Sequence, residues 1–254
     1  MRFISIIVYR HIIALNGAWA GMFCNVVLEP LVFLVGFGFG FARIMAGEDI
    51  NTDYLTFVLP GMMLWSSAAT AIIEGSFTVH RRCFDLKLWQ AWLATPLTLP
   101  WLLAGETTAI ALRCFVSSLV MLLMGALLGA HINLWWLAIL PLILLVCVAH
   151  AAMGMWAASL ATKRDQLMAM WVFLGSTTLI FGGALTPTTT FPSWVNAIFS
   201  YLPTPHALAF IRPMADGTLA FESLWYHGAM LALITVCSVA LALTGFMRRL
   251  YKEA

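Results

Sequence analysis

The sequence predicts an all-α integral membrane protein with six transmembrane helices and both termini in the cytoplasm. Composition is the first observation behind this prediction. Of 254 residues, 62% are hydrophobic and only 9% are charged, with a mean hydropathy of +0.94, whereas soluble domains carry roughly 25% charge. The second observation is that no gap between the long apolar runs has room for a soluble domain. We therefore expect a single transmembrane domain over residues 1–254, and a net charge of +2 gives no reason to expect a nucleic-acid partner.

The N-terminal stretch, residues 1–16, has the pattern of an amphipathic helix that lies at the membrane interface. It does not match a signal peptide, because Arg10, His11 and Asn16 interrupt its apolar core and no small-residue cleavage site follows.

A transmembrane helix needs about 20 apolar residues. The apolar runs predict six of them, at residues 20–41, 54–79, 101–129, 134–160, 167–185 and 223–247. The remaining apolar stretch, 186–222, is broken by prolines and cannot be one straight helix. We expect it to form an outer hairpin region, with a short re-entrant or interfacial helix over Phe191 to Leu202.

Basic residues support this topology, because Lys and Arg are retained on the cytoplasmic side. Ten of the 13 lie at the N-terminus, in the 80–92 loop, in the 161–166 loop or at the C-terminus. A seventh span would place the basic C-terminus outside.

The stretch between spans two and three, residues 80–97, interrupts the apolar chain most sharply. Five ionisable residues fall within eight positions: His80, Arg81, Arg82, Asp85 and Lys87. Asp85 to Thr95 then has helical periodicity, with Leu86, Trp89 and Leu93 on one face and Trp92 beside it. Pro96 ends the predicted helix. Such a helix either lies in the membrane interface or docks in a groove of a partner, and the pattern alone allows both.

Four ionisable residues lie in or near the predicted spans: Glu29, Glu74, Glu106 and Arg113. A charge at mid-span costs ~2.5–3.5 kcal/mol on insertion scales, so each side chain should face protein or water. They form either a polar seam along a transport path or interhelical pairs that fix the packing.

Motifs for catalysis and for cofactor binding are missing from the sequence. It contains neither H-E-x-x-H nor G-x-S-x-G, and its five cysteines are scattered, so we expect neither a catalytic site nor a metal site. It also has no G-x-x-x-x-G-K-[ST] loop for nucleotide phosphates. Any ATP-driven activity therefore requires an ATPase on another chain.

Two stretches resemble the type-2 ABC exporter permease family, and within it the NodJ-like branch that exports nodulation factors, which are lipo-oligosaccharides. One is Trp-Gln-Ala-Trp-Leu-Ala-Thr-Pro-Leu at residues 89–97, followed by Gly105-Glu106. The other combines Phe-Gly-Gly-Ala-Leu-Thr-Pro at 181–187, Phe-Pro-Ser-Trp at 191–194, Leu-Pro-Thr-Pro-His at 202–206 and Ile-Arg-Pro at 211–213. The predicted layout matches the family along nearly the whole chain. One departure is Gly182-Gly183, where the family commonly has Ser-Gly.

The resemblance implies a permease subunit, not an enzyme, in a bacterial inner membrane. Two copies would form a homodimer, each docked to an ABC ATPase that holds ATP and Mg²⁺. The substrate would be an exported amphipathic or lipid-linked molecule: a lipo-oligosaccharide, a polysaccharide or a hydrophobic drug. By the same resemblance, residues 80–97 contain a coupling helix that contacts the ATPase through Asp85, Leu86, Trp89, Trp92 and Leu93. The outer hairpin would act as a gate that includes Pro192, Trp194, Pro203, His206 and Arg212.

Other hypotheses stay open at this point. The intramembrane charges motivate an ion-coupled secondary transporter without an ATPase, although no inverted repeat is visible. An intramembrane enzyme or an assembly scaffold is a third possibility. Arg212 either guides an anionic or sugar head group or holds the outer hairpin in place.

Overall fold

The structure is a computed structural model that describes residues 2–15, 19–41, 52–133, 135–185, 190–215 and 221–252. These residues form helices joined by short turns, and none of them lies in a β-strand. Four of the helical segments are π-helical and carry η labels. In chain order the segments are α1 (Arg2–Leu15), α2 (Trp19–Phe23), η1 (Cys24–Leu28), α3 (Glu29–Val35), η2 (Gly36–Phe41), α5 (Thr52–Ile73), η3 (Glu74–Thr78), η4 (Arg81–Asp85), α6 (Leu88–Leu93), α7 (Leu99–Leu127), α8 (Trp135–Leu160), α9 (Arg164–Phe181), α10 (Ser193–Phe199), α11 (Pro203–Ala215) and α12 (Phe221–Lys252).

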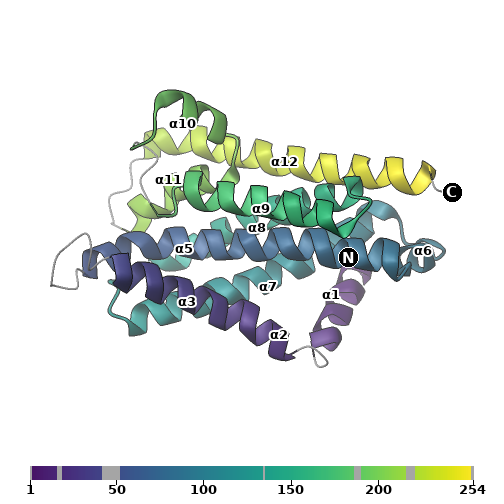
Figure 1. Ribbon diagram of the computed structural model, residues 1–254, viewed down its shortest axis with the longest axis horizontal. Helices are drawn as coiled ribbons and strands as arrows, with labels where there is room; N and C mark the ends of the chain where they lie inside the picture. The colour runs from purple at the N-terminus through teal and green to yellow at the C-terminus, as the bar shows by residue number, and fades with distance from the viewer. Residues whose placement is uncertain are drawn as a thin grey trace.

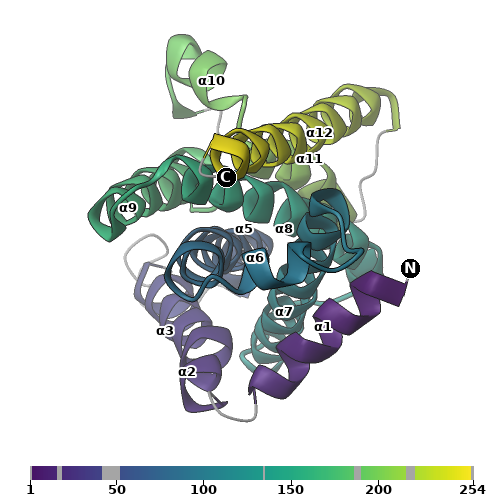
Figure 2. The ribbon, with the colours of Figure 1, turned by 90° about the vertical axis from the view of Figure 1, so that its right-hand side faces the viewer.

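The long helices α5, α7, α8, α9 and α12 run along the long axis of the molecule (Figure 1). Helix α5 occupies the centre, and it packs against α3, α7, α8 and α9 (Figure 2). Its side chains from Leu55 to Ile72 are mostly buried, including Val58, Met62 and Ala68, which have no exposed surface. A helix that is apolar all round needs such a central position.

Glycines allow α5 and η3 to lie directly against α8. A Cβ added to Gly75 would lie 2.4 Å from the carbonyl oxygen of Ala151, and one added to Gly154 would lie 2.6 Å from that of Ile72. Both partner atoms are backbone, which cannot move aside as a side chain can. The two helices therefore approach at a distance that only glycine permits at these positions.

Four helices are long and apolar enough to cross a membrane: Leu55–Asp85, Leu99–Leu127, Ile139–Leu160 and Trp225–Leu250. They coincide with the second, third, fourth and last predicted spans. The predicted spans 20–41 and 167–185 fall on helical segments that are not among these four. Helix α9 has only 18 residues, and Arg164 and Asp165 occupy its first turn, which shortens its apolar part. The protein is thus a multi-pass helical membrane protein, and six spans remain a prediction.

Different helices lie at the two ends of the bundle. Helix α6, the N-terminal helix α1 and the C-terminal end of α12 lie toward one end, and α10 lies at the other (Figure 1). Helix α1 runs across the side of the bundle, against α7 (Figure 2). This agrees with the predicted grouping of both termini with residues 80–97, while the membrane side on which they lie stays a prediction.

The proline-rich stretch is not one helix. It contains α10 and then α11, separated by a turn at Ser200–Leu202. The short helix predicted over Phe191 to Leu202 corresponds to α10. Residues 186–189, with Pro187, and residues 216–220 lie outside the described part of the outer hairpin region.

Candidate functional site

Residues 80–97, the predicted coupling region, begin as a continuation of the central helix and then turn sharply. The turn is at Lys87, whose φ of 52° and ψ of 25° lie in the left-handed region. A left-handed residue cannot continue a right-handed helix, so the predicted helix Asp85 to Thr95 is wrong at its start. Helix α6 begins only at Leu88, and Leu86 does not share a helical face with Trp89 and Leu93.

The end of α6 is closer to the prediction. The helix stops at Leu93, and the Thr95 hydroxyl donates to the carbonyl oxygen of Trp92 at 2.6 Å. Pro96 follows, and α7 begins at Leu99.

Trp89 points into the protein. Its side chain has no exposed surface, and its ring centroid lies 4.7 Å from that of Phe246 in α12. Phe84, just before α6, stacks on the same Phe246 at 6.2 Å. Trp89 therefore anchors α6 to the last helix of its own chain, and any effect it has on a partner must pass through that packing.

Trp92 connects α6 to the N-terminal helix. The guanidinium carbon of Arg10 lies 4.5 Å from the centroid of the Trp92 ring, in a cation–π arrangement. Arg10 also donates to Glu106 Oε1 at 3.2 Å. One arginine of α1 thus contacts both α6 and α7.

Glu106 is the centre of a buried ionic cluster. Its carboxylate has no exposed surface and accepts hydrogen bonds from Arg82 at 2.5 Å and from His11 at 2.9 Å, besides the one from Arg10. Burial is the main cause that lowers the pKa of His11 from 6.5, with Arg82 and Arg10 adding to it and Glu106 opposing it. The cluster joins η4, α1 and α7.

Sequence reasoning singled out Glu106 but not these three partners. A signal was present: Arg10 and His11 interrupt an otherwise apolar helix, and Arg82 precedes α6. Which carboxylate they would meet depends on how α1 crosses α7, and the sequence pattern does not give that crossing.

Further contacts tie the coupling region to α8, α9 and α12. Asp85 pairs with Arg164 at 2.6 Å on the surface. Arg249 donates to the carbonyl oxygens of Ala158 and Ser159, each at 3.2 Å, and lies over the Phe84 ring at 3.6 Å. His80 donates to the carbonyl oxygen of Ala161 at 3.2 Å.

A small surface of the coupling region faces away from the bundle. Its residues are exposed: Leu86, Lys87, Gln90 and Ala91. Leu86 is an apolar side chain that is 51% exposed, whereas Leu93 is partly buried against the core. We call these four residues the outward face of the coupling region.

The four predicted intramembrane charges do not form one seam. Arg113 of α7 pairs with Glu74 of η3, and Glu106 belongs to the separate cluster near α1. Glu29 is half-buried and takes part in none of the ion pairs found among the described residues. Glu74, Glu106 and Arg113 thus make interhelical pairs, as the packing interpretation expects.

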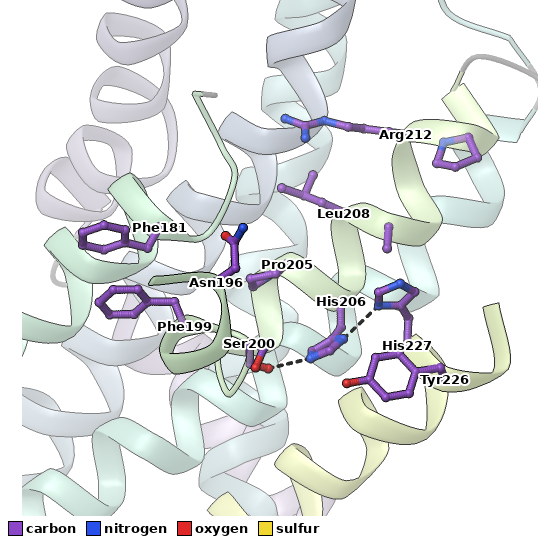
Figure 3. A pocket seen from close by; sticks show the side chains of 12 residues that line it. Phe181, Asn196, Phe199, Ser200, Pro205, His206, Leu208, Arg212, Tyr226 and His227 are labelled. Atoms are coloured by element: carbon purple, nitrogen blue, oxygen red, sulfur yellow. Dashed lines mark hydrogen bonds between the residues drawn. The ribbon is translucent and has the colours of Figure 1, made fainter. Parts of the chain in front are cut away.

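The predicted outer gate residues lie around α10 and α11. Pro192 precedes α10, Trp194 is exposed on it, and Pro203 begins α11. His206 is buried and binds Ser200 and His227 (Figure 3). Arg212 donates to the carbonyl oxygen of Gly183 at 2.5 Å and lies over Phe57 at 4.2 Å, so it holds α11 against the end of α9 and α5.

A family profile described as "ABC-2 type transporter" matches residues 2–215 of the chain. The chain belongs to this family. Among curated proteins, it is 27% identical over 227 residues to nodulation protein J of Rhizobium leguminosarum bv. trifolii, covering 89% of this chain and 86% of the relative. It is 26% identical over 224 residues to nodulation protein J of Bradyrhizobium diazoefficiens, covering 88% and 85%.

A third relative is the daunorubicin resistance ABC transporter permease protein DrrB1 of Streptomyces coeruleorubidus, 26% identical over 221 residues, with 82% of this chain and 72% of the relative covered. No solved structure matches the chain significantly. Family membership makes the chain the membrane subunit of an ABC transporter, as the sequence resemblance implied, and does not favour the ion-coupled alternative.

Proposed function

We propose that the permease exports an amphipathic or lipid-linked substrate, driven by an ATPase that docks on the outward face of the coupling region. The observation that carries this proposal is that the coupling region, η4 together with α6, is fixed to four other helices while its outward face stays exposed. Trp89 fixes it to α12, Trp92 and Arg10 to α1, Arg82 to Glu106 of α7, and Asp85 to Arg164 of α9.

Such bracing is what a force-transmitting helix requires. A partner that pushes on Leu86 and Gln90 moves a rigid body, because Trp89 is fully buried and both oxygens of the Glu106 carboxylate are paired. Rigid-body tilting of packed helices is a common route from a local event to a global change. Nucleotide-driven closure of the ATPase would thereby tilt α1, α7 and α12 together.

ATP and Mg²⁺ belong to the partner in this proposal, since the chain has no phosphate-binding loop. Two permease copies and two ATPase subunits would make the working transporter, in the inner membrane of a bacterium. Apolar helices with few charges suit a substrate that carries a lipid.

The test is purification of the tagged permease from its native host in mild detergent, with mass spectrometry of bound partners. We expect an ATPase in equal amount and its loss when Leu86→Asp places a desolvated charge in the contact. The matched control is Ile132→Asp, which also replaces an exposed aliphatic side chain by aspartate but lies between α7 and α8, and it should retain the ATPase. A permease that purifies alone in several mild detergents would contradict the proposal.

A further inference from the structure

Two cavities of different chemistry lie near the end of α12 that is closest to α10 and α11. The first, the outer pocket, has a volume of about 430 Å³ and lies between α10, α11 and the start of α12 (Figure 3). The second, the α12 groove, has a volume of about 380 Å³ and lies between α8 and α12. Their linings are neighbours in the chain at two places: Ser200 and Tyr201 line one cavity each, and Tyr226 and Met230 do so about one turn apart on α12.

The hydrogen bonds of the outer pocket fix which atoms accept. His206 Nε2 donates to the carbonyl oxygen of Ser200 at 2.6 Å, because a carbonyl only accepts. When both imidazoles are neutral, His206 Nδ1 therefore accepts from His227 Nδ1 at 3.0 Å. His227 Nε2 is left as an acceptor.

Two more polar side chains line the outer pocket. The Asn196 amide nitrogen donates to the carbonyl oxygen of Phe191 at 3.2 Å, which leaves its side-chain oxygen as an acceptor. The Tyr226 hydroxyl can donate or accept. A ligand with hydroxyl donors satisfies this set.

The pocket disfavours a cationic head group. No carboxylate is among the described residues that line it, and Arg212, which donates to Gly183 and lies over Phe57, gives the lining a permanent positive charge. The aromatic rings of Phe181 and Phe199, stacked at 3.9 Å, form the opposite wall (Figure 3).

The α12 groove is apolar and has the length of one membrane leaflet. It is lined by Met153, Trp156, Met230, Leu233, Ile234 and Leu241, with Cys237 and Ser238 between them. From Met230 to Leu241 an α-helix rises about 16 Å, close to half of the ~30 Å hydrocarbon core of a bilayer. Methionines adapt their shape to flexible apolar ligands.

We propose that the outer pocket and the α12 groove form one binding site for an amphipathic molecule with an acyl chain and a hydroxyl-bearing head group that carries no positive charge. The head group occupies the outer pocket, and the chain lies along α12. The exposed aromatic residues Trp194, Tyr201 and Trp225 surround this end, as aromatic side chains do at a membrane–water interface. The identification of this molecule as the exported substrate rests on the proposed function, whereas the binding site itself does not depend on it.

The experiment uses the full-length permease in phosphatidylcholine nanodiscs and a long-chain alkyl maltoside that carries a diazirine in its chain. After photolysis, we expect labelled peptides from residues 230–241 and around Tyr201. Unlabelled alkyl maltoside should remove the labelling, whereas an alkyl trimethylammonium of equal chain length should not. Equal competition by both, or labelling spread over other exposed helices such as α9, would overturn the site.

Variants test each half of the site. Cys237→Phe fills the groove and should lower the labelling several-fold, while Val236→Phe, which adds the same ring at a neighbouring position that is 65% exposed and outside the groove, should not. His227→Ala combined with Tyr226→Phe should abolish the preference for maltoside over ammonium. Unchanged labelling in Cys237→Phe would overturn the placement of the chain.

The assay needs no ATPase, which separates it from the proposed function. A permease that binds no ATPase but is labelled at this site would contradict the proposed function and support the binding site. A permease that binds its ATPase but is not labelled there would contradict the binding site alone.

Discussion

Arg82 and Glu106 form an ion pair at 2.5 Å, and the Glu106 carboxylate has no exposed surface. The pair joins η4 to α7, on either side of α6. Because Arg10 and His11 bind the same carboxylate, removing it would leave three basic groups without their shared anion. Removing one partner of a buried pair is far more costly than the net contribution of the pair.

Glu106→Ala should therefore destabilise the permease by about 3–5 kcal/mol, measured as a lower thermal unfolding midpoint of the purified protein. Glu106→Gln should lose less stability, because the oxygen of the glutamine side chain still accepts hydrogen bonds. The comparison is Asp85→Ala at the exposed pair with Arg164, where we expect about 0–1 kcal/mol. Equal losses at the two positions would contradict the role given to burial.

His11 makes the docking of α1 depend on pH. Its pKa lies below 6.5, chiefly because burial disfavours the imidazolium, so undocked α1 binds protons more readily than docked α1. Docking is then strongest above pH 6.5 and weakens as the pH falls from 6.5 through the lowered pKa. Hydrogen exchange of α1 amides, corrected for the intrinsic effect of pH, should rise in this window.

His11→Gln provides the control for this pH effect, because glutamine keeps a hydrogen-bond donor for Glu106 but does not titrate. The protection of its α1 amides, corrected in the same way for intrinsic exchange, should no longer change as the pH falls through this window. A wild-type α1 with pH-independent protection would show that another contact, such as that between Arg10 and Trp92, controls docking.

The sequence predicted the parts of the fold that depend on composition and periodicity. Long apolar runs placed the four clearest spans, and prolines correctly excluded one helix over residues 186–222. Periodicity failed at Asp85 to Thr95, because the left-handed backbone of Lys87 divides a pattern that side chains alone present as continuous.

The sequence also did not predict which side chains contact one another within the chain. Trp89 has the same character whether it faces an ATPase or Phe246, and Glu106 and Arg113 lie on one helical face yet bind different helices. Both facts follow from how helices cross, which depends on contacts far apart in the chain.

Gly75 and Gly36 should respond oppositely to alanine. A Cβ on Gly75 would lie 2.4 Å from the Ala151 carbonyl oxygen, whereas one on Gly36 meets nothing within 4 Å. Gly75→Ala should cost about 1–3 kcal/mol of stability through overpacking, and Gly36→Ala should gain about 0.5–1 kcal/mol because alanine suits a helix better than glycine. Thermal unfolding measures both, and a tolerated Gly75→Ala would contradict the close packing of η3 on α8.

Substitutions of Trp89 and Leu86 should distinguish the anchoring of α6 to its own chain from the docking of the ATPase. Trp89→Ala removes a fully buried indole that packs on Phe246, so it should lower stability by about 3–5 kcal/mol. Leu86→Ala removes an exposed side chain and should change stability by less than about 0.5 kcal/mol. Its effect should instead be on the partner, as weaker binding of the ATPase and slower ATP-dependent transport in reconstituted vesicles.

The two readouts are measured on the same preparations, as the unfolding midpoint and the amount of ATPase retained. Trp89→Phe keeps an aromatic ring against Phe246 and should recover most of the stability lost in Trp89→Ala. If Trp89→Phe folds normally yet loses the ATPase while Leu86→Ala retains it, Trp89 itself reaches the partner in the working complex. The coupling region would then have to rearrange on docking, with α6 released from α12.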